Sequence, residues 1–360
     1  MSEGRTGAAV AVVALAALVG LLRADPAAAD PPAPSDYRSV VDAIEPAADG
    51  VDAGVVGGDA FLELTVEPGR EVVVAGYQGE PYLAFRPDGT VQRNRRSPAT
   101  YVNESRDGAA EPPAGTDAEA EPDWETVADG GTYAWHDHRI HWMGSGRPDG
   151  ADPGEWTRPW TVDITVDGTP TRITGTLALV EGVNPLPWLT LGLAAAVAVA
   201  IAGRRRPLLA AVIAALVAAA LAGGVGWSQW TDAPAGSGVS PLLVAVPLAG
   251  LVAAGLALAL APRLGRRFVT AATLAGAAAV AGWALLRLEV LWTPVLPTVL
   301  DAGLDRAGTA LGLGLALAAA GLVVWGSGIA LMEGEQAPAL DPENEKEAGA
   351  AATVAGGDRR

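Results

Sequence analysis

Residues 188–226 read WLTLGLAAAVAVAIAGRRRPLLAAVIAALVAAALAGGVG, two apolar runs separated by three arginines. Each run is close to the length of about 20 residues that a helix needs to cross the hydrocarbon core of a bilayer. Three further runs of this kind follow, so the sequence predicts an α-helical membrane bundle of about five spans within residues 184–332. The expected spans are 188–203, 207–226, 240–261, 268–286 and 307–332.

The links between these runs differ in charge. Arg204 to Arg206 form one link, and Arg263, Arg266 and Arg267 lie in another, whereas the links 227–239 and 287–306 carry Trp227, Trp230 and Trp292. Short cytoplasmic links are enriched in arginine, and tryptophan gathers at the membrane interface. We therefore expect a multi-pass plasma-membrane protein, with residues 30–183 extracytoplasmic and the C-terminus cytoplasmic.

The charge of the chain is concentrated in one region. The net charge of the 360 residues is −17, and residues 30–183 hold 28 acidic and 11 basic residues, which gives the same value of −17. The membrane block at +4 and the tail 333–360 at −4 cancel. An acidic soluble part argues against nucleic acid as a partner, and the absence of cysteine excludes disulfides and thiolate metal sites.

Both ends of the chain have the composition of segments outside the fold. Arg5, the apolar run 8–22 and the small residues Ala27 and Ala29 predict a signal peptide at 1–29. An uncleaved signal anchor is the alternative, and both place residue 30 outside the cell. The acidic tail 333–360 has no apolar period, so we expect it to be disordered in the cytoplasm.

Alternation of apolar and polar residues indicates β-strands in the extracytoplasmic region. The clearest strands are predicted at 61–66, 71–76, 82–85, 160–166 and 171–180, with turn signals between them. About seven short strands joined by such turns predict an all-β sandwich over residues 30–183.

The three histidines of the chain lie within one stretch, which also contains a methionine. They are His136, His138 and His141, followed by Met143. On a strand, His136 and His138 would point to the same face, and His141 would join them where the strand bends. Imidazoles with a thioether suit copper, whereas zinc would need an added carboxylate. One hypothesis is therefore a metal site formed by these four residues.

The same stretch is open to two other interpretations. Tyr133, Trp135 and Trp142 flank the histidines, which indicates a core strand whose imidazoles bond to the backbone or to acids. Asp137 and Arg139 would then pair with each other. A pH switch is the third hypothesis, because histidine titrates near pH 6.5.

Other chemical signatures are few. The chain has no H-E-x-x-H, G-x-S-x-G, P-loop or dinucleotide motif, so we expect a protein that is not an enzyme. The basic cluster Arg93 to Arg96 would pair with neighbouring acids or bind an acidic partner or lipid headgroup. No ionisable residue lies inside an expected span, which argues against an ion pathway through the helices alone.

Two segments resemble the CopC-like copper-resistance family of periplasmic Ig-like β-barrels. Residues 39–50 are similar to the family's N-terminal "SxPADG" stretch, and residues 166–177 are similar to its closing "SADGHPVxG" hairpin. The resemblance implies an Ig-like β-fold fused to membrane helices. Asp36 and Thr169 stand where the family has its histidine ligands, so no ligand is carried over. The whole chain is also similar to actinobacterial exported membrane proteins whose activity is not assigned.

Three functional hypotheses follow for a protein held in the lipid bilayer. In the first, the exported β-domain binds a metal ion, with copper expected, or senses the envelope. In the second, it is a structural or interaction module that recruits an envelope protein to the membrane. In the third, the chain is a subunit of a transporter complex.

Overall fold

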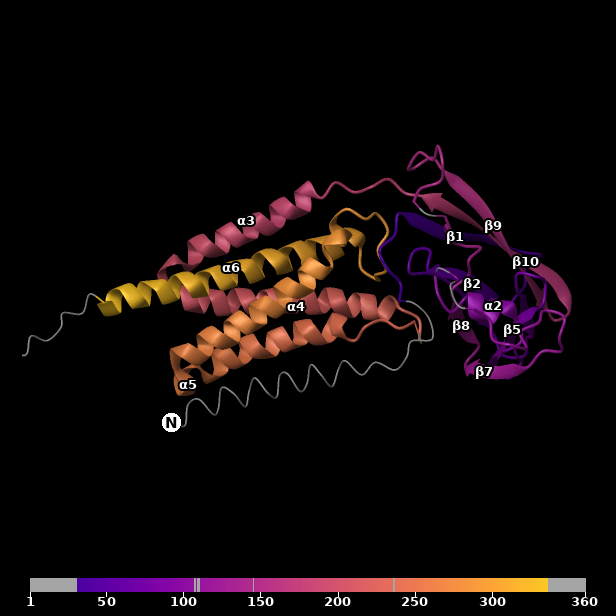
Figure 1. The fold of residues 1–360 in the computed structure, drawn as a ribbon, viewed down its shortest axis with the longest axis horizontal. Helices are drawn as coiled ribbons and strands as arrows, with labels where there is room; N and C mark the ends of the chain where they lie inside the picture. Colours follow the sequence, from indigo (N-terminus) through magenta and orange to yellow (C-terminus); the bar gives the residue numbers. More distant parts are fainter. Residues whose placement is uncertain (1–30, 107, 109–110, 145, 236, 336–360) are drawn as a thin grey trace, which may run out of the picture.

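The computed structural model describes residues 31–106, 108, 111–144, 146–235 and 237–335, with only the backbone described for 327–335. A β-rich domain lies at one end of a bundle of long helices (Figure 1). The expected signal peptide at 1–29 and the tail from 336 onward lie outside the described residues.

The β-domain contains two antiparallel sheets. The larger has the strand order β1-β10-β9-β4-β5-β6-β7, and the smaller has the order β2-β3-β8. The strands are β1 (Tyr37–Glu45), β2 (Val51–Val56), β3 (Phe61–Val66), β4 (Val72–Ala75), β5 (Pro81–Phe85), β6 (Val91–Asn94), β7 (Trp124–Ala128), β8 (Thr132–Trp135), β9 (Thr157–Val166) and β10 (Thr169–Leu179), with a short helix α2 (Pro98–Val102) after β6.

The hairpin of β9 and β10 shows how the sequence sets the register. Asp167 and Gly168 form the two-residue turn with φ angles of 47° and 80°, the left-handed geometry that matches the twist of paired strands. The Asp167 carboxylate accepts a 2.7 Å bond from Arg70 and one from the Glu71 backbone N–H. This turn places alternate residues of both strands on the buried face, as the alternation predicted.

One hydrophobic cluster draws residues from both sheets. Leu62 and Leu64 of β3 and Trp135 of β8 pack with Val74 of β4 and Ile164 of β9. Each of these side chains is buried, so the two sheets share a core. The predicted antiparallel β-fold is confirmed, and its closure into an Ig-like sandwich stays a prediction.

Four helices among the described residues are long and apolar enough to cross a membrane. They confirm the expected membrane block, and α6 contacts the other three. Their bounds are α3 (Leu186–Ala202), α4 (Pro207–Asp232), α5 (Leu242–Leu286) and α6 (Ala302–Glu335).

Helix α5 is broken within the expected arginine link. Its 45 residues would span roughly 68 Å if straight, about twice the hydrocarbon core. Gly265 interrupts it with φ 74° and ψ 179°. Trp283 Nε1 donates to the Leu243 carbonyl at 2.9 Å, and a Cβ on Gly250 would lie 3.2 Å from the Gly276 carbonyl oxygen. The two halves therefore run antiparallel, and Figure 1 shows the bend at the end of the bundle remote from the sheets.

Glycines mark the closest helix contacts. A Cβ on Gly314 of α6 would lie 2.1 Å from the Gly192 carbonyl oxygen of α3, and one on Gly226 would lie 2.2 Å from the Leu243 carbonyl oxygen. Such approaches need a residue without a side chain. Gly255 and Gly282 have open space beside them, so close packing does not require glycine at these two positions.

Candidate functional site

The histidine stretch does not continue the strand that precedes it. Strand β8 ends at Trp135, and the residues from His136 onward form turns and irregular backbone. The alternation of a strand, which would have set His136 and His138 on one face, therefore does not apply. We call residues 136–143 the histidine segment.

A local ion pair ends the strand. Asp137 is fully buried and accepts a 2.9 Å bond from Trp135 Nε1. Its two oxygens also accept from Arg139, at 2.7 Å from Nε and 2.6 Å from Nη2. Burial alone would raise the pKa of Asp137, but the charge and hydrogen bonds of Arg139 outweigh it and lower that pKa. The pairing of Asp137 with Arg139 is thus confirmed, as a contact two residues apart.

Tyr77 attaches this ion pair to the rest of the domain. The Arg139 guanidinium lies 5.0 Å from the centre of the Tyr77 ring. The Tyr77 hydroxyl donates to Asn103 Oδ1 at 2.5 Å and accepts from the His138 backbone N–H at 2.9 Å. Burial is the main reason that the pKa of Tyr77 is raised. These bonds fix the start of the histidine segment.

Each imidazole bonds to a backbone carbonyl. Since a carbonyl only accepts, the ring nitrogen donates in every case. His136 Nδ1 donates to Ala60 at 2.7 Å, and its ring stacks 4.2 Å from that of Phe61. His138 Nε2 donates to Ser105 at 3.0 Å, and His141 Nε2 donates to Arg106 at 3.3 Å. The three rings therefore hold the turn before β3 and the segment that follows α2.

His141 is the most deeply placed of the three. Its side chain is buried, and its Nδ1 atom has no hydrogen-bond partner among the described residues. Burial, followed by the positive charge of Arg106, lowers the pKa of His141 to about 3. His141 is therefore neutral at physiological pH.

The four predicted metal ligands are only partly brought together. The rings of His138 and His141 have centroids 5.2 Å apart, whereas Met143 is 44% exposed. In the described part of the chain, no three His, Asp or Glu side chains are grouped to hold a metal ion. The metal site stays a prediction.

The basic cluster at 93–96 pairs with acids in and just before the next strand, β7. Arg93 bonds to Glu125 at 2.6 Å, and Arg95 bonds to Asp123 at 2.7 Å. Of the two interpretations of this cluster, the pairing with neighbouring acids is confirmed for these two arginines.

The turn between β2 and β3, to which His136 bonds, also contacts the membrane block. Asp59 in this turn is buried and pairs with Arg106 at 2.6 Å. Burial is the main cause of the raised pKa of Asp59, although Arg106 opposes it. A Cβ on Gly58 (φ 82°) would lie 2.5 Å from Val295 Cγ1, so glycine allows the close contact with the link between α5 and α6.

We call residues 287–301, which link α5 to α6, the junction loop. Ser35 and Val295 exchange two backbone hydrogen bonds, at 3.0 and 3.1 Å. The Val183 N–H donates to the Trp292 carbonyl at 3.1 Å. The loop is thus joined to both ends of the β-domain chain, just before β1 and just after β10.

On the bundle side, Arg306 holds the junction loop by its backbone. Its guanidinium donates to three carbonyls, those of Val290 at 3.0 Å, Thr293 at 2.8 Å and Pro294 at 3.0 Å. Arg306 is itself buried, so it supplies these carbonyls with hydrogen-bond donors inside the protein.

A buried ion pair lies next to this contact. Arg287 Nη2 bonds to Asp305 Oδ1 at 2.9 Å, and Arg287 also donates to Gln229 of α4. Helix α6 begins at Ala302, five residues before the expected start of the last span at 307, and Asp305 and Arg306 are buried in its first turns. The only signal in the sequence was a group of charges, Asp301 to Arg306, inside an otherwise apolar block.

Comparisons with protein-family models, curated proteins and solved structures find no match to this chain. The resemblance to the CopC-like family therefore stays a prediction.

The low pKa of His141 predicts acid sensitivity. Below its ordinary value of 6.5 the unfolded chain takes up a proton that the folded chain excludes until about pH 3. Stability is therefore lost as pH falls through this window, by about 2 kcal/mol at pH 5, or roughly 4–8 °C in Tm. Thermal unfolding of the full chain in detergent, followed by near-ultraviolet circular dichroism, measures this loss.

Two variants separate His141 from its surroundings. His141→Phe should flatten the slope between about pH 7.5 and pH 5, while Met143→Ala, at an exposed neighbour, should leave it unchanged. Two carboxyl groups also affect the stability in acid. The lowered pKa of Asp137 adds to the loss only near and below its ordinary value of 3.8, and the raised pKa of Asp59 opposes the loss. An identical slope in His141→Phe and the unmodified chain would contradict the assignment.

Proposed function

We propose that this chain is a five-span plasma-membrane protein whose extracytoplasmic β-sandwich works as a non-catalytic binding module, coupled to the bundle as one unit. The β-domain presents a binding surface to the cell envelope. The junction loop couples any movement of the β-domain to the helices. The acidic tail is cytoplasmic. This is the interaction-module hypothesis of the sequence analysis. Envelope sensing is the role that we propose for such a module.

The distribution of charge supports this orientation. The arginines at 204–206 and those flanking Gly265 gather at the end of the bundle that is remote from the β-domain (Figure 1). Trp227, Trp230 and Trp292 are each more than two-fifths exposed and lie near the other end. With α5 counted as two spans, because its halves run antiparallel, every link agrees with the positive-inside rule.

The observation that carries the proposal is the junction loop, which is bonded on both sides. Ser35 and Val183 of the β-domain bond to its backbone, and Arg306 of α6 bonds to three of its carbonyls. A tethered domain without coupling would need only the covalent link between β10 and α3. Contacts from a second segment favour a unit that moves together.

The histidines fit a structural role in this module. Each one bonds to a carbonyl of the segments 59–60 or 105–106, and those segments include Asp59 and Arg106 next to the junction loop. The bonds of His136 and His138 need no metal, whereas the buried Nδ1 atom of His141 is left without a hydrogen-bond partner among the described residues.

Single cysteines test the orientation, because the chain has none of its own. A membrane-impermeant maleimide applied to intact cells should label Ala114→Cys, at an exposed site of the β-domain. Arg205→Cys, at the exposed end of α3, should be labelled only after permeabilisation. Labelling of Arg205→Cys and protection of Ala114→Cys in intact cells would refute the proposed orientation.

Copper binding is the second candidate, favoured by the unpartnered Nδ1 atom of buried His141 beside His138. Metal-bound histidines commonly donate their other ring nitrogen to a carbonyl, and all three rings make such a bond. Met143, the fourth predicted ligand, is 44% exposed.

A copper titration of the full chain in detergent separates the two candidates. The structural role predicts that the unmodified chain and His138→Gln/His141→Gln bind copper(II) equally weakly. A copper site predicts at least a roughly tenfold loss of affinity in the double variant, with no loss in Arg172→Gln, a surface variant on β10. That second result would replace the structural role with the metal hypothesis.

A further inference from the structure

An apolar crevice of about 250 Å³ lies beside the bend of α5, at the end of the bundle remote from the β-domain (Figure 1). Leu208 and Val212, one turn apart at the start of α4, line one side of it. Ala257 and Ala261, one turn apart in α5, line the other side. Arg266 is the one charged residue among the described residues that line it. We call this space the bend crevice.

The bend crevice opens toward the outside of the bundle. Leu209 of α4 and Leu258 of α5 also line it, and they are 42% and 50% exposed. One helical turn covers about 5.4 Å, so the lining residues extend at least that far along both helices from the bend. With the helices as spans, lipid chains surround them at this depth. The crevice therefore presents apolar walls to an acyl chain, with a guanidinium at the end nearer the headgroups.

Two arginine links come together beside the bend crevice. Arg266 Nη2 donates to the Gly326 carbonyl of α6 at 2.7 Å. A Cβ on Gly326 would lie 3.0 Å from Pro207 Cγ and 3.9 Å from Arg266 Nη2. Pro207 directly follows Arg206 and directly precedes Leu208, which lines the crevice. Arginines from two separate links of the chain therefore meet at one point of α6, next to the mouth of the crevice.

This end of the bundle carries a net positive charge. Its six arginines, at 204–206, 263, 266 and 267, are all exposed. None of them pairs with a carboxylate among the side chains that the structure describes. Between residues 186 and 288 the sequence has a single acidic residue, Asp232, which ends α4 at the opposite end of the bundle. The bond from Arg266 to Gly326 goes to a neutral carbonyl and uses one nitrogen of a group with five N–H donors.

We propose that the bend crevice and the arginines beside it bind an anionic phospholipid. One acyl chain lies against the apolar walls, and the phosphate accepts hydrogen bonds from Arg266 and Arg206. Guanidinium groups match the oxygens of a phosphate, and basic pockets between membrane helices bind acidic lipid headgroups. The proposal rests on the helices being spans, as in the proposed function, and the choice of the cytoplasmic leaflet rests on the proposed orientation. The bound lipid contacts α4 and both halves of α5.

Isothermal titration of the full chain in detergent tests this with three probes. They are a short-chain phosphatidylglycerol, the matching diacylglycerol without phosphate, and glycerol phosphate without acyl chains. The phosphatidylglycerol should bind at least roughly tenfold more tightly than either of the other two, because only it fills the crevice and reaches the arginines. Equal affinity for phosphatidylglycerol and diacylglycerol would overturn the proposal, as would the absence of phosphatidylglycerol binding.

Two kinds of variant separate a defined site from general attraction to a basic surface. The double variant Arg206→Gln/Arg266→Gln should weaken phosphatidylglycerol binding at least roughly tenfold, whereas Arg172→Gln, on the β-domain, should leave it unchanged. Ala261→Phe fills the crevice and keeps every arginine, so it should also weaken binding. Ala194→Phe makes the same change at an exposed position of α3 and should not. Unchanged affinity in the double variant or in Ala261→Phe, at the Tm of the unmodified chain, would contradict the proposal.

The acidic tail 333–360 is the alternative occupant, because its charge of −4 also complements the arginines. Under the proposal, a chain that ends at Met332 binds phosphatidylglycerol as the full chain does. Binding that appears only after this truncation would assign the arginines to the tail and overturn the proposal. Since detergent removes any dependence on orientation, a reversed topology would fail the labelling experiment and leave this result intact.

Discussion

Three backbone carbonyls of the junction loop are bound by one buried guanidinium, that of Arg306. Buried backbone carbonyls cannot reach water, so they need hydrogen-bond donors within the protein. Arg306 supplies them, and Arg287 and Asp305 pair next to it. The fixed loop then presents Val295 to the β-domain. The contact between the two parts therefore runs through a loop whose backbone Arg306 holds.

The histidine segment is the far end of the same set of contacts. His136 bonds to Ala60, and Gly58 in the same turn packs on Val295. His141 bonds to Arg106, whose side chain pairs with Asp59. The histidine segment is therefore connected to the junction loop in two ways, through the turn at 58–60 and through Arg106. In the structural role proposed for them, the three histidines would support this contact through their bonds to backbone carbonyls.

Much of the fold follows from local sequence. The alternation at 61–66 and 160–180 predicted β3, β9 and β10, because one face of each strand is buried in the shared core. The apolar runs predicted the bundle, and the arginine link at 263–267 contains the break of α5 at Gly265. These features depend on period and composition, which are visible along the chain.

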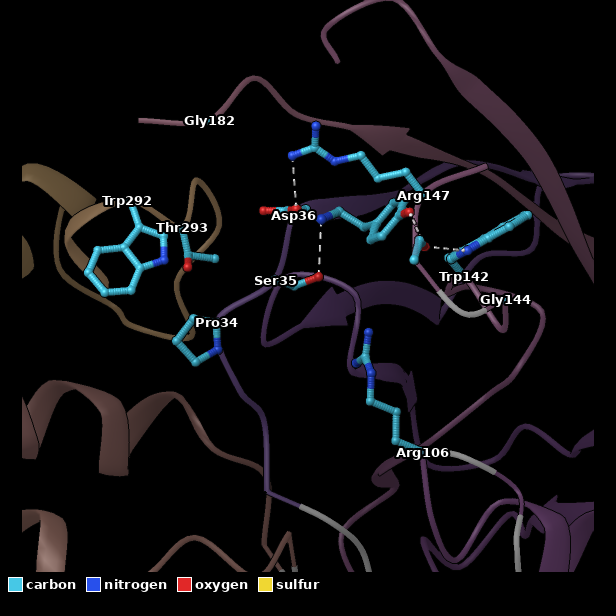
Figure 2. A pocket seen from close by; sticks show the side chains of 12 residues that line it. Pro34, Ser35, Asp36, Arg106, Trp142, Gly144, Arg147, Gly182, Trp292 and Thr293 are labelled. Carbon is cyan, nitrogen blue, oxygen red and sulfur yellow. Dashed lines mark hydrogen bonds and ion pairs between the residues drawn. The ribbon is translucent and has the colours of Figure 1, made fainter. Parts of the chain in front are cut away.

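The histidine segment and the junction loop were less predictable, because their conformations depend on contacts between distant residues and on one local ion pair. The strand was expected to run through His136, but the carboxylate of Asp137 bonds to Trp135 and Arg139 and turns the chain. Arg306 was placed before a span, since no sequence pattern shows its bonds to the carbonyls of Val290, Thr293 and Pro294. Residues 35, 106, 147 and 292, which are distant in the chain, line one cavity between the β-domain and the junction loop (Figure 2).

The coupling of the β-domain to the bundle is tested most directly by a disulfide between Ser35→Cys and Val295→Cys. A pair that exchanges both backbone bonds has Cα atoms about 5.5 Å apart, within the range of a disulfide. Mild oxidation in membranes should remove both thiols from maleimide labelling, and reduction should restore them. The control pair Asp88→Cys with Val295→Cys should keep both thiols reactive, because Asp88 lies in the turn between β5 and β6, where the neighbouring Gly89 bonds to Gly131. Reactive thiols in the Ser35/Val295 pair after oxidation would contradict a docked domain.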